Sequence, residues 1–149
     1  PDAVGAEAFA VFIAARNEVE LFPDVRPVLD RLAPRFRLAT LSNGNADLHR
    51  IGLAPLFSVM LNAERIGVAK PHPEAFAALA RELDCEPARI LYVGDDPQAD
   101  VVGARAAGLR TAWVNRHGAA WPGIGPQADL EIASLHDLEA ALMRVNPRS

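Results

Sequence analysis

The sequence lacks the features that would place it in a disulfide-stapled, membrane-bound or nucleic-acid-binding class. Its 149 residues include one cysteine, Cys85, so no disulfide can close within the chain, and we expect a reducing, cytoplasmic compartment. No apolar run reaches the length that spans a bilayer. The net charge is −4 and no basic block stands out, so neither a nucleic acid nor a membrane is an expected partner.

Histidines and the largest aromatic residues do not form an evident site either. The four histidines are scattered, and no two have the spacing of a metal-ligand pair, so each is interpreted as a surface residue or a local contact. The two tryptophans are interpreted as packing residues. Half of the residues are hydrophobic, which is enough for one domain with a real core. The four histidines are His49, His72, His117 and His136, and the two tryptophans are Trp113 and Trp121.

The most informative stretch is an apolar run that ends in acids. Residues 90–93 predict a short strand buried on both faces. Gly94 then allows a sharp turn, and Asp95, Asp96 and Asp100 follow. Carboxylates beyond the C-terminal end of a strand lie where open α/β sheets bind ligands, and oxygen ligands without Cys or His suit Mg²⁺. The alternative is an acidic turn that caps a helix, because Asp is favoured at helix N-termini.

Two further segments carry polar groups at a predicted strand end or turn. The strand predicted at 36–41 runs into Ser42 and Asn43, a turn that can bind an anion through its hydroxyl and the N–H groups of the next helix. A Ser- or Asx-turn that only caps this helix is the alternative. Lys70 stands between an apolar dipeptide and a proline-framed turn, so it is less free than a surface lysine and suits the anchoring of a charge cluster.

Predicted strands and helices alternate along most of the chain, which indicates a parallel sheet with right-handed crossovers. Because parallel strands end at one edge, the polar residues above are expected to converge there around a metal. A loop rich in Gly and Pro follows the fifth strand, at 116–127. The predicted helices lie at 6–16, 25–32, 46–51, 74–84, 100–107 and from 135 onwards, and the predicted strands at 36–41, 56–61, 90–93, 111–115 and 130–132.

Three segments, taken in their order, resemble the motifs of the haloacid dehalogenase-like (HAD) hydrolases. They are Leu41-Ser42-Asn43-Gly44, a Lys-Pro segment from Gly67 to Phe76, and a Gly-Asp-Asp segment from Val93 to Ala104. Trp113-Val114-Asn115-Arg116 is also similar to an ending found in the dehalogenase and phosphatase branches of that family. The resemblance covers about residues 20–145 and implies an α/β fold with a Rossmannoid three-layer core around a parallel sheet.

The resemblance assigns a role to each matching position. The serine hydroxyl and the asparagine backbone would bind the phosphoryl group, and the lysine would neutralise negative charge. The first acid after the glycine would bind Mg²⁺ with help from the second, and the last acid would support the metal or the lysine. The implied catalytic residues are therefore Ser42, Asn43, Lys70 and Asp100, and the implied metal ligands are Asp95 and Asp96.

One family motif has no counterpart in the sequence. The family's first motif is an Asp-x-Asp on the first strand, whose first Asp forms an aspartyl-phosphate and whose second is the general acid/base. Asp2 and Asp24 do not follow buried strands and are not assigned this role. Residues 1–20 resemble the last part of the family's helical cap and residues 21–149 its α/β core, so we expect an incomplete core without its nucleophile.

The missing strand has a structural cost. In the family it lies between the strands that end here at Ser42 and Asp95, so both would lose a hydrogen-bonding neighbour. Three explanations are open: a fragment whose front half stays associated with it, a strand supplied by another chain, as in a homodimer, or a degenerate protein with a rearranged sheet. We favour the first and expect the missing N-terminal segment as a partner, from the same gene product or a second chain.

The resemblance implies that the complete protein is a Mg²⁺-dependent phosphatase of a small phosphorylated metabolite. The Gly-Asp-Asp segment favours a phosphatase over the related 2-haloacid dehalogenases, which work without a metal and have Ser or Asn in place of the metal-binding Asp. Such a dehalogenase, or a non-catalytic binding or interaction module, is the alternative. We expect no multiple-turnover activity from these residues alone, because the nucleophile is missing.

Overall fold

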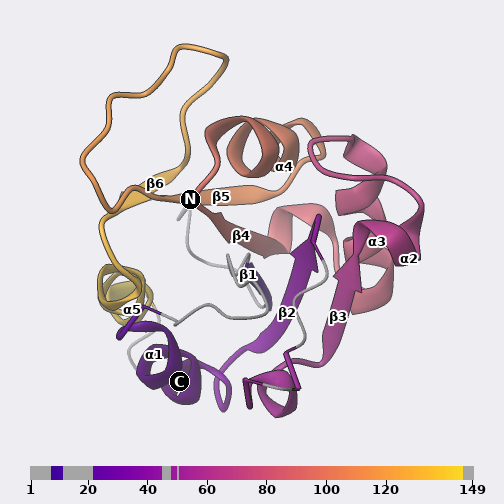
Figure 1. Ribbon diagram of the computed structural model, residues 1–149. Helices are drawn as coiled ribbons and strands as arrows, with labels where there is room; N and C mark the ends of the chain where they lie inside the picture. Colours follow the sequence, from indigo (N-terminus) through magenta and orange to yellow (C-terminus); the bar gives the residue numbers. More distant parts are fainter. Residues whose placement is uncertain (1–7, 12–21, 45–47, 50, 146–149) are drawn as a thin grey trace.

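The computed structural model describes residues 8–11, 22–44, 48–49 and 51–145. They build a six-stranded sheet with the strand order β3-β2-β1-β4-β5-β6, and every neighbouring pair is parallel (Figure 1). The predicted α/β class with a parallel sheet is confirmed. The strands are β1 (Ala8–Val11), β2 (Arg37–Ser42), β3 (Val59–Asn62), β4 (Ile90–Gly94), β5 (Arg110–Val114) and β6 (Leu130–Ile132), and the helices are α1 (Val25–Leu32), α2 (Ala63–Ile66), α3 (Pro73–Leu83), α4 (Gly103–Ala106) and α5 (Leu135–Val145).

Helices cover both faces of the sheet. Figure 1 shows α1 and α5 together on one side, and α2, α3 and α4 on the other. The buried apolar residues accordingly form two clusters, one with α1 and α5 and one with α3 and α4. In β4, Leu91 and Val93 belong to the first cluster while Ile90 and Tyr92 belong to the second, as expected where successive side chains point to opposite faces. The fold is therefore the three-layer arrangement that the family resemblance implies.

The helix over residues 25–32 shows how the sequence pattern produces this packing. Its apolar residues Val25, Val28, Leu29 and Leu32 follow the i, i+3, i+4, i+7 spacing, and all four are buried. Pro27 lies in the first turn, where its missing N–H costs no hydrogen bond. The stripe packs against α5 and the sheet, which fixes this helix on the face opposite α3.

The structure corrects the prediction of a helix over residues 6–16 for the part of it that is described. Ala8–Val11 is a strand, β1, in parallel register with both β2 and β4. The expected gap in the middle of the sheet is therefore filled by the chain's own residues. An apolar run this short fits a buried strand as well as a buried helix. The strand is favoured here because the backbone N–H and C=O groups of β2 and β4 that face each other need hydrogen-bond partners. The rest of the proposed cap remnant, residues 1–7 and 12–20, lies outside the described ranges.

Two other boundaries differ from the prediction. The helix predicted at 46–51 is not seen in its described residues, where 48–49 and 51 form turns. The helix predicted at 100–107 begins earlier, with a π-helical turn at Pro97–Val102 that continues into α4. Asp96 causes the early start, because its Oδ1 accepts hydrogen bonds from the N–H groups of Gln98 and Ala99, both at 2.9 Å.

A buried carboxylate joins the start of α1 to the C-terminal part of the chain. Asp24 Oδ2 accepts a 2.6 Å hydrogen bond from the N–H of Leu135, and Asp24 Oδ1 lies 3.1 Å from Nη2 of Arg116. The sequence suggested Asp24 as the N-cap of α1, but its side chain makes no bond to that helix. Burial opposes ionisation of Asp24, yet the Leu135 hydrogen bond and the Arg116 charge outweigh it and lower its pKa below 3.8.

Replacing Asp24 with Asn is expected to lower the free energy of unfolding by about 1.5–3 kcal/mol at neutral pH, because a charged hydrogen bond and an ion pair are lost. A lowered folded-state pKa gives stability that is present above the unfolded value of 3.8 and lost as the pH falls through the folded value. The difference in the free energy of unfolding between the parent protein and Asp24→Asn should therefore become smaller below about pH 4. Urea unfolding at several pH values measures this. Asp30→Asn, at an exposed i, i+4 pair, is the control; a constant gap at all pH values would contradict the assignment.

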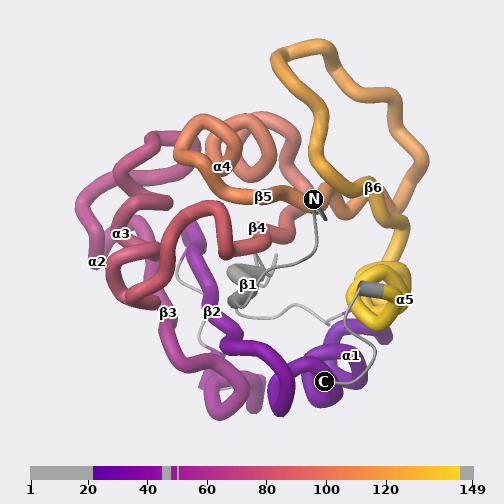
Figure 2. Tube along the Cα trace, turned by 180° about the vertical axis from the view of Figure 1, so that it is seen from behind, coloured from indigo at the N-terminus to yellow at the C-terminus, as the bar shows by residue number. Residues whose placement is uncertain are grey.

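The polar residues of interest lie at one edge of the sheet. Because β2 and β4 both run parallel to β1 on either side of it, their C-terminal ends, at Ser42 and Gly94, lie at the same edge of the sheet. Beyond β5, the loop between β5 and β6 projects from the body of the molecule, and it is as prominent from behind (Figure 2) as from the front. None of the helices in the described ranges combines the length and apolar character that a bilayer crossing requires.

Candidate active site

A buried ion pair lies at the centre of the site. Lys70 Nζ is 2.6 Å from Oδ1 of Asp100, and the two side chains are only 2% and 1% exposed. The second oxygen, Asp100 Oδ2, accepts a 3.0 Å hydrogen bond from the N–H of Asp96. Both carboxylate oxygens of Asp100 are thus used, which is the condition under which a buried charge is tolerated. This contact is the one expected if Asp100 supports the lysine, one of the two roles that the resemblance implied, and its catalytic role stays a prediction.

Burial and attraction act against each other in this pair. Burial lowers the pKa of Lys70 and raises the pKa of Asp100, while the attraction between the two groups opposes both shifts. Asp95 and Asp96 also favour the charged form of Lys70, so both acids lie within electrostatic reach of its ammonium group. The turn after β4 therefore sets the charge environment of Lys70.

The backbone of Lys70 is held by Asn43. The side-chain Oδ1 of Asn43 accepts a 2.8 Å hydrogen bond from the N–H of Lys70, and its Nδ2 donates to the carbonyl oxygen of Lys70 at 3.0 Å. The resemblance implied a role for the backbone at position 43, whereas the structure shows its side chain joining the β2 turn to the Lys-Pro segment. Asn43 thus fixes the position from which the lysine side chain starts.

Tyr92 supports Lys70 from within the sheet, and it is not among the residues predicted from the sequence. Its ring centroid lies 5.4 Å from Nζ of Lys70, and Phe76 packs on it edge-to-face at 5.1 Å. The hydroxyl donates a 2.9 Å hydrogen bond to the carbonyl oxygen of Leu41. Burial raises the pKa of Tyr92 well above 10, so the phenol stays neutral. A lone tyrosine in an otherwise aliphatic buried strand is the signal that could have identified it.

Ser42 and Asp95 are two predicted residues with side-chain groups open to a ligand, and Oδ2 of Asp96 is a third such group. Ser42 is half-buried, and its Oγ accepts a 2.9 Å hydrogen bond from the N–H of Gly44, the Ser-turn that the sequence left as an alternative. The carboxylate of Asp95 is exposed and makes no hydrogen bond or ion pair with any other described residue. Its carbonyl oxygen accepts a 3.1 Å hydrogen bond from Nε1 of Trp113, which holds the turn in place.

The donor set fits a magnesium ion with few protein ligands. No group of three or more His, Cys, Asp or Glu side chains that could hold a metal is found within the described ranges. Asp96 uses Oδ1 to cap the π-helical turn and Asp100 uses both oxygens, so both oxygens of Asp95 and Oδ2 of Asp96 are open to an ion. Mg²⁺ typically keeps several waters and binds through one or two carboxylates together with a phosphate. The metal roles of Asp95 and Asp96 stay predictions.

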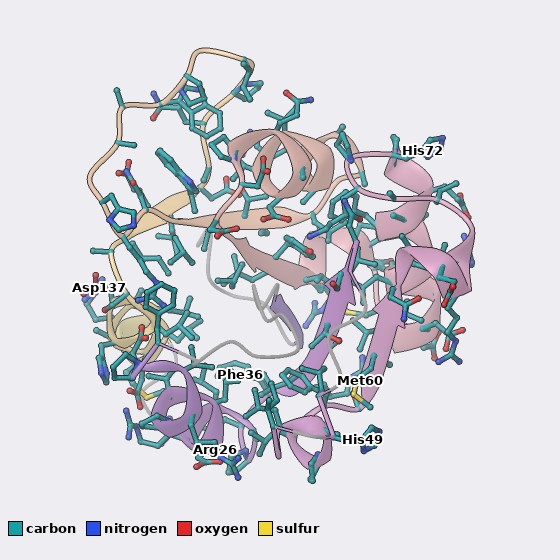
Figure 3. All side chains as sticks on the ribbon, viewed as in Figure 1. Arg26, Phe36, His49, Met60, His72 and Asp137 are labelled. Carbon is teal, nitrogen blue, oxygen red and sulfur yellow. The ribbon has the colours of Figure 1, made fainter. Side chains whose placement is uncertain are left out.

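The histidines behave as the sequence analysis expected where the structure shows their contacts. Figure 3 places His49 and His72 at the periphery of the molecule, and both are exposed. His72 caps α3, because its Nδ1 accepts a 3.0 Å hydrogen bond from the N–H of Glu74. The proline-framed turn therefore positions Lys70 and starts the helix that packs behind it, and the polar chemistry of the site rests on the lysine and the acids.

Comparison with known proteins agrees with this geometry. A family model described as haloacid dehalogenase-like hydrolase matches residues 1–108. A phosphoserine phosphatase of Thermus thermophilus is 37% identical over 116 residues, which are 74% of this chain and 47% of that protein. The chain spans about half the length of the curated relatives that it matches.

Solved structures from both branches of the family are also similar. A 2-haloacid dehalogenase from Pseudomonas syringae pv. tomato DC3000 has a TM-score of 0.82 at 40% identity, covering 87% of this chain and 56% of that one. A HAD phosphatase from Thermococcus onnurineus has a TM-score of 0.76 at 30% identity, covering 83% of this chain and 58% of that one. The motifs, the sheet and these likenesses agree, and the chain belongs to the haloacid dehalogenase-like hydrolase family.

Proposed function

We propose that the complete protein is a Mg²⁺-dependent phosphatase of a small phosphorylated metabolite. One observation carries the proposal: the exposed, uncommitted carboxylate of Asp95 lies beyond β4, within electrostatic reach of the buried Lys70–Asp100 pair. A cation bound to Asp95 and the ammonium group of Lys70 would then both neutralise negative charge on the phosphate group of the substrate. Metal-independent dehalogenation is the second candidate, since a curated relative that is 33% identical is a haloacetate dehalogenase of Moraxella. A metal-independent reaction would leave the Asp95 carboxylate without a function.

Each residue contributes to holding a phosphoryl group. The Lys70 ammonium, fixed by Asp100 and by the Asn43 side chain, supplies a positive charge whose position does not change during the reaction. Ser42 offers a hydroxyl at the same edge of the sheet, and it can donate to a phosphate oxygen in place of its 3.3 Å bond to the carbonyl oxygen of Gly44. Mg²⁺ on Asp95 would supply further neutralisation of phosphate oxygens.

The nucleophile is assigned to a segment that is not among these 149 residues. β1, which takes the central place in the sheet, consists of Ala8, Phe9, Ala10 and Val11 and contains no carboxylate. We therefore expect the 149-residue chain to bind Mg²⁺ and phosphate without multiple turnover. A partner that carries an Asp-x-Asp segment stays a proposal, and intact-mass measurement of the purified protein under denaturing conditions detects a second polypeptide directly.

Replacing Asp95 with Asn is expected to weaken Mg²⁺ binding at least tenfold, because a neutral amide replaces the one predicted site carboxylate whose two oxygens are both without a partner among the described residues. Calorimetric titration of the chain with MgCl₂, and with inorganic phosphate in the presence and absence of Mg²⁺, measures the change. Phosphate should bind more tightly when Mg²⁺ is present, and the mutation should remove this gain.

The matched control is Glu82→Gln, which makes the same change of charge at an exposed position of α3. It should leave both affinities unchanged. Phosphate binding that is indifferent to Mg²⁺, or an Asp95→Asn protein that binds the ion as the parent does, would overturn the metal assignment. Halide release from a 2-haloacid without metal, by a preparation that includes the nucleophile segment, would favour the dehalogenase reading.

A further inference from the structure

A pocket of about 330 Å³ lies directly beside the candidate active site. It is formed beyond the C-terminal ends of β4 and β5, under the loop that projects in Figure 1. Asp95 lines it, so a ligand whose phosphate is held at the active site can extend its remaining part into the pocket. Most of the other lining residues are apolar: Phe22, Pro97, Trp113, Val114, Ala119, Ala120 and Pro122, with Asn115, Arg116 and His117 as the polar members.

The loop that covers the pocket is fastened at its base. Asn115 Nδ2 donates to the carbonyl oxygen of Ala119 at 2.8 Å and to Oε2 of Glu131 at 2.7 Å, and Asn115 Oδ1 accepts from the N–H of Ala119 at 3.0 Å. At the other end of the loop, Asp129 Oδ2 accepts a 2.8 Å hydrogen bond from the N–H of Thr111. A pocket whose walls are already fixed loses little entropy when a ligand binds.

Two aromatic residues connect the pocket wall to the active-site turn. Trp113 is buried, and its Nε1 donates to the carbonyl oxygen of Asp95. Trp121 packs edge-to-face on Trp113 with the ring centroids 5.3 Å apart, and its own Nε1 donates to Gly125 at 3.0 Å. Both tryptophans of the sequence are therefore at the pocket or in contact with its wall. Such aromatic and proline surfaces favour a flat, weakly polar group.

A fixed cation completes the pocket. The guanidinium carbon of Arg116 lies 3.8 Å from the ring centroid of Phe22, a residue that is 52% exposed, and Nη2 is paired with Asp24. A guanidinium has five N–H donors, and this ion pair engages one nitrogen. Arg116 can therefore donate to an acceptor oxygen on a ligand while Phe22 and Asp24 hold it in place.

We propose that this pocket binds the organic part of the substrate, a compact ring that carries an acceptor oxygen toward Arg116. The proposal rests on the proposed phosphatase function and names the class of phosphate monoester that fits it. The volume lies at the lower end of the range of ligand pockets, about 300–1,000 Å³, which suits one ring and excludes long chains. The apolar walls select the ring, and the arginine selects the oxygen.

The test compares three probes by calorimetry, all with Mg²⁺: inorganic phosphate, phenyl phosphate and 4-carboxyphenyl phosphate. Phenyl phosphate should bind about tenfold more tightly than inorganic phosphate, a difference of about 1.4 kcal/mol. It should also change the tryptophan fluorescence, which inorganic phosphate should leave nearly constant. 4-Carboxyphenyl phosphate should bind more tightly than phenyl phosphate. Arg116→Lys, which keeps the charge beside Asp24, should remove this difference in affinity between the two ring compounds.

A pocket-filling variant separates this proposal from the phosphatase assignment. Ala120→Leu places a larger side chain in the pocket from an exposed loop position, whereas Ala106→Leu makes the same change at an exposed position of α4 away from it. Ala120→Leu should abolish the preference for phenyl phosphate and preserve inorganic phosphate binding; Ala106→Leu should alter neither. If inorganic phosphate binds but the ring gives no advantage, the pocket proposal is wrong and the phosphatase proposal stands. If no probe binds, both are wrong.

Discussion

Replacing Lys70 with Met should lower the free energy of unfolding by about 3–5 kcal/mol, because it leaves the buried Asp100 without its counter-charge. The methionine fills a similar volume, so the loss reports the uncompensated carboxylate and not a cavity. Only the hydrogen bond from the N–H of Asp96 to Asp100 would remain among the contacts shown. Urea or thermal unfolding at neutral pH measures the loss, and the same protein should no longer bind phosphate.

The pH dependence of this variant identifies the cause. Without the lysine, burial raises the pKa of Asp100 above its ordinary value of 3.8, so the folded state binds a proton more tightly than the unfolded state does. Stability should then be recovered as the pH falls and lost as it rises. The double variant Lys70→Met with Asp100→Asn, which has no buried charge, should regain part of the loss at neutral pH. A Lys70→Met protein that loses less than about 1 kcal/mol would contradict the argument.

Replacing Gly94 with Ala should be nearly as harmful, although it adds only one methyl group. A Cβ at this position would lie 2.4 Å from both Cγ and Oδ2 of Asp100, far inside van der Waals contact. Either the carboxylate or the end of β4 must move. Overpacking of a core typically costs about 1–3 kcal/mol, and we expect the upper part of this range because the displaced group is half of the Lys70 ion pair. Chemical denaturation gives the loss, and Mg²⁺-dependent phosphate binding should weaken with it.

Gly44→Ala is the matched control for this effect. It lies at the same edge of the sheet, but a Cβ there would meet its nearest neighbour, Ser42 Oγ, at 3.8 Å, which is an ordinary contact. Its unfolding free energy should stay within about 0.5 kcal/mol of the parent protein. Equal losses at the two glycines would mean that backbone flexibility, and not the contact with Asp100, explains the Gly94 result.

Elements with their own strong pattern could be predicted from the sequence. The spacing of Val25, Val28, Leu29 and Leu32 is sufficient for α1, since a buried stripe on a helix leaves a regular trace. The same holds for β4, whose uninterrupted apolar run reflects burial on both faces. At the site, the order of the Lys-Pro and Gly-Asp-Asp segments was enough to place a lysine and acids at one edge.

What could not be predicted depends on partners distant in sequence. Ala8–Val11 is a strand because its backbone pairs with β2 and β4. The local sequence pattern contains no information about this pairing. Asp24 looks like a helix cap, but its oxygens are used by Leu135 and Arg116, more than ninety residues away. The role of the Asn43 side chain likewise depends on Lys70, 27 residues further along the chain.

The hydrogen bond from Tyr92 to Leu41 has a consequence for the sheet edge that carries the candidate site. It connects β4 to β2 directly, although β1 lies between those two strands in the sheet. The Tyr92 side chain therefore connects the two strands that flank β1, on the face of the sheet covered by α3. Because Leu41 precedes Ser42 and Tyr92 lies two residues before Gly94, this bond acts with the pairing of β1 to fix the distance between the two strand ends. We therefore expect the groups that are predicted to bind phosphate at these two strand ends to keep their spacing as long as this hydrogen bond forms.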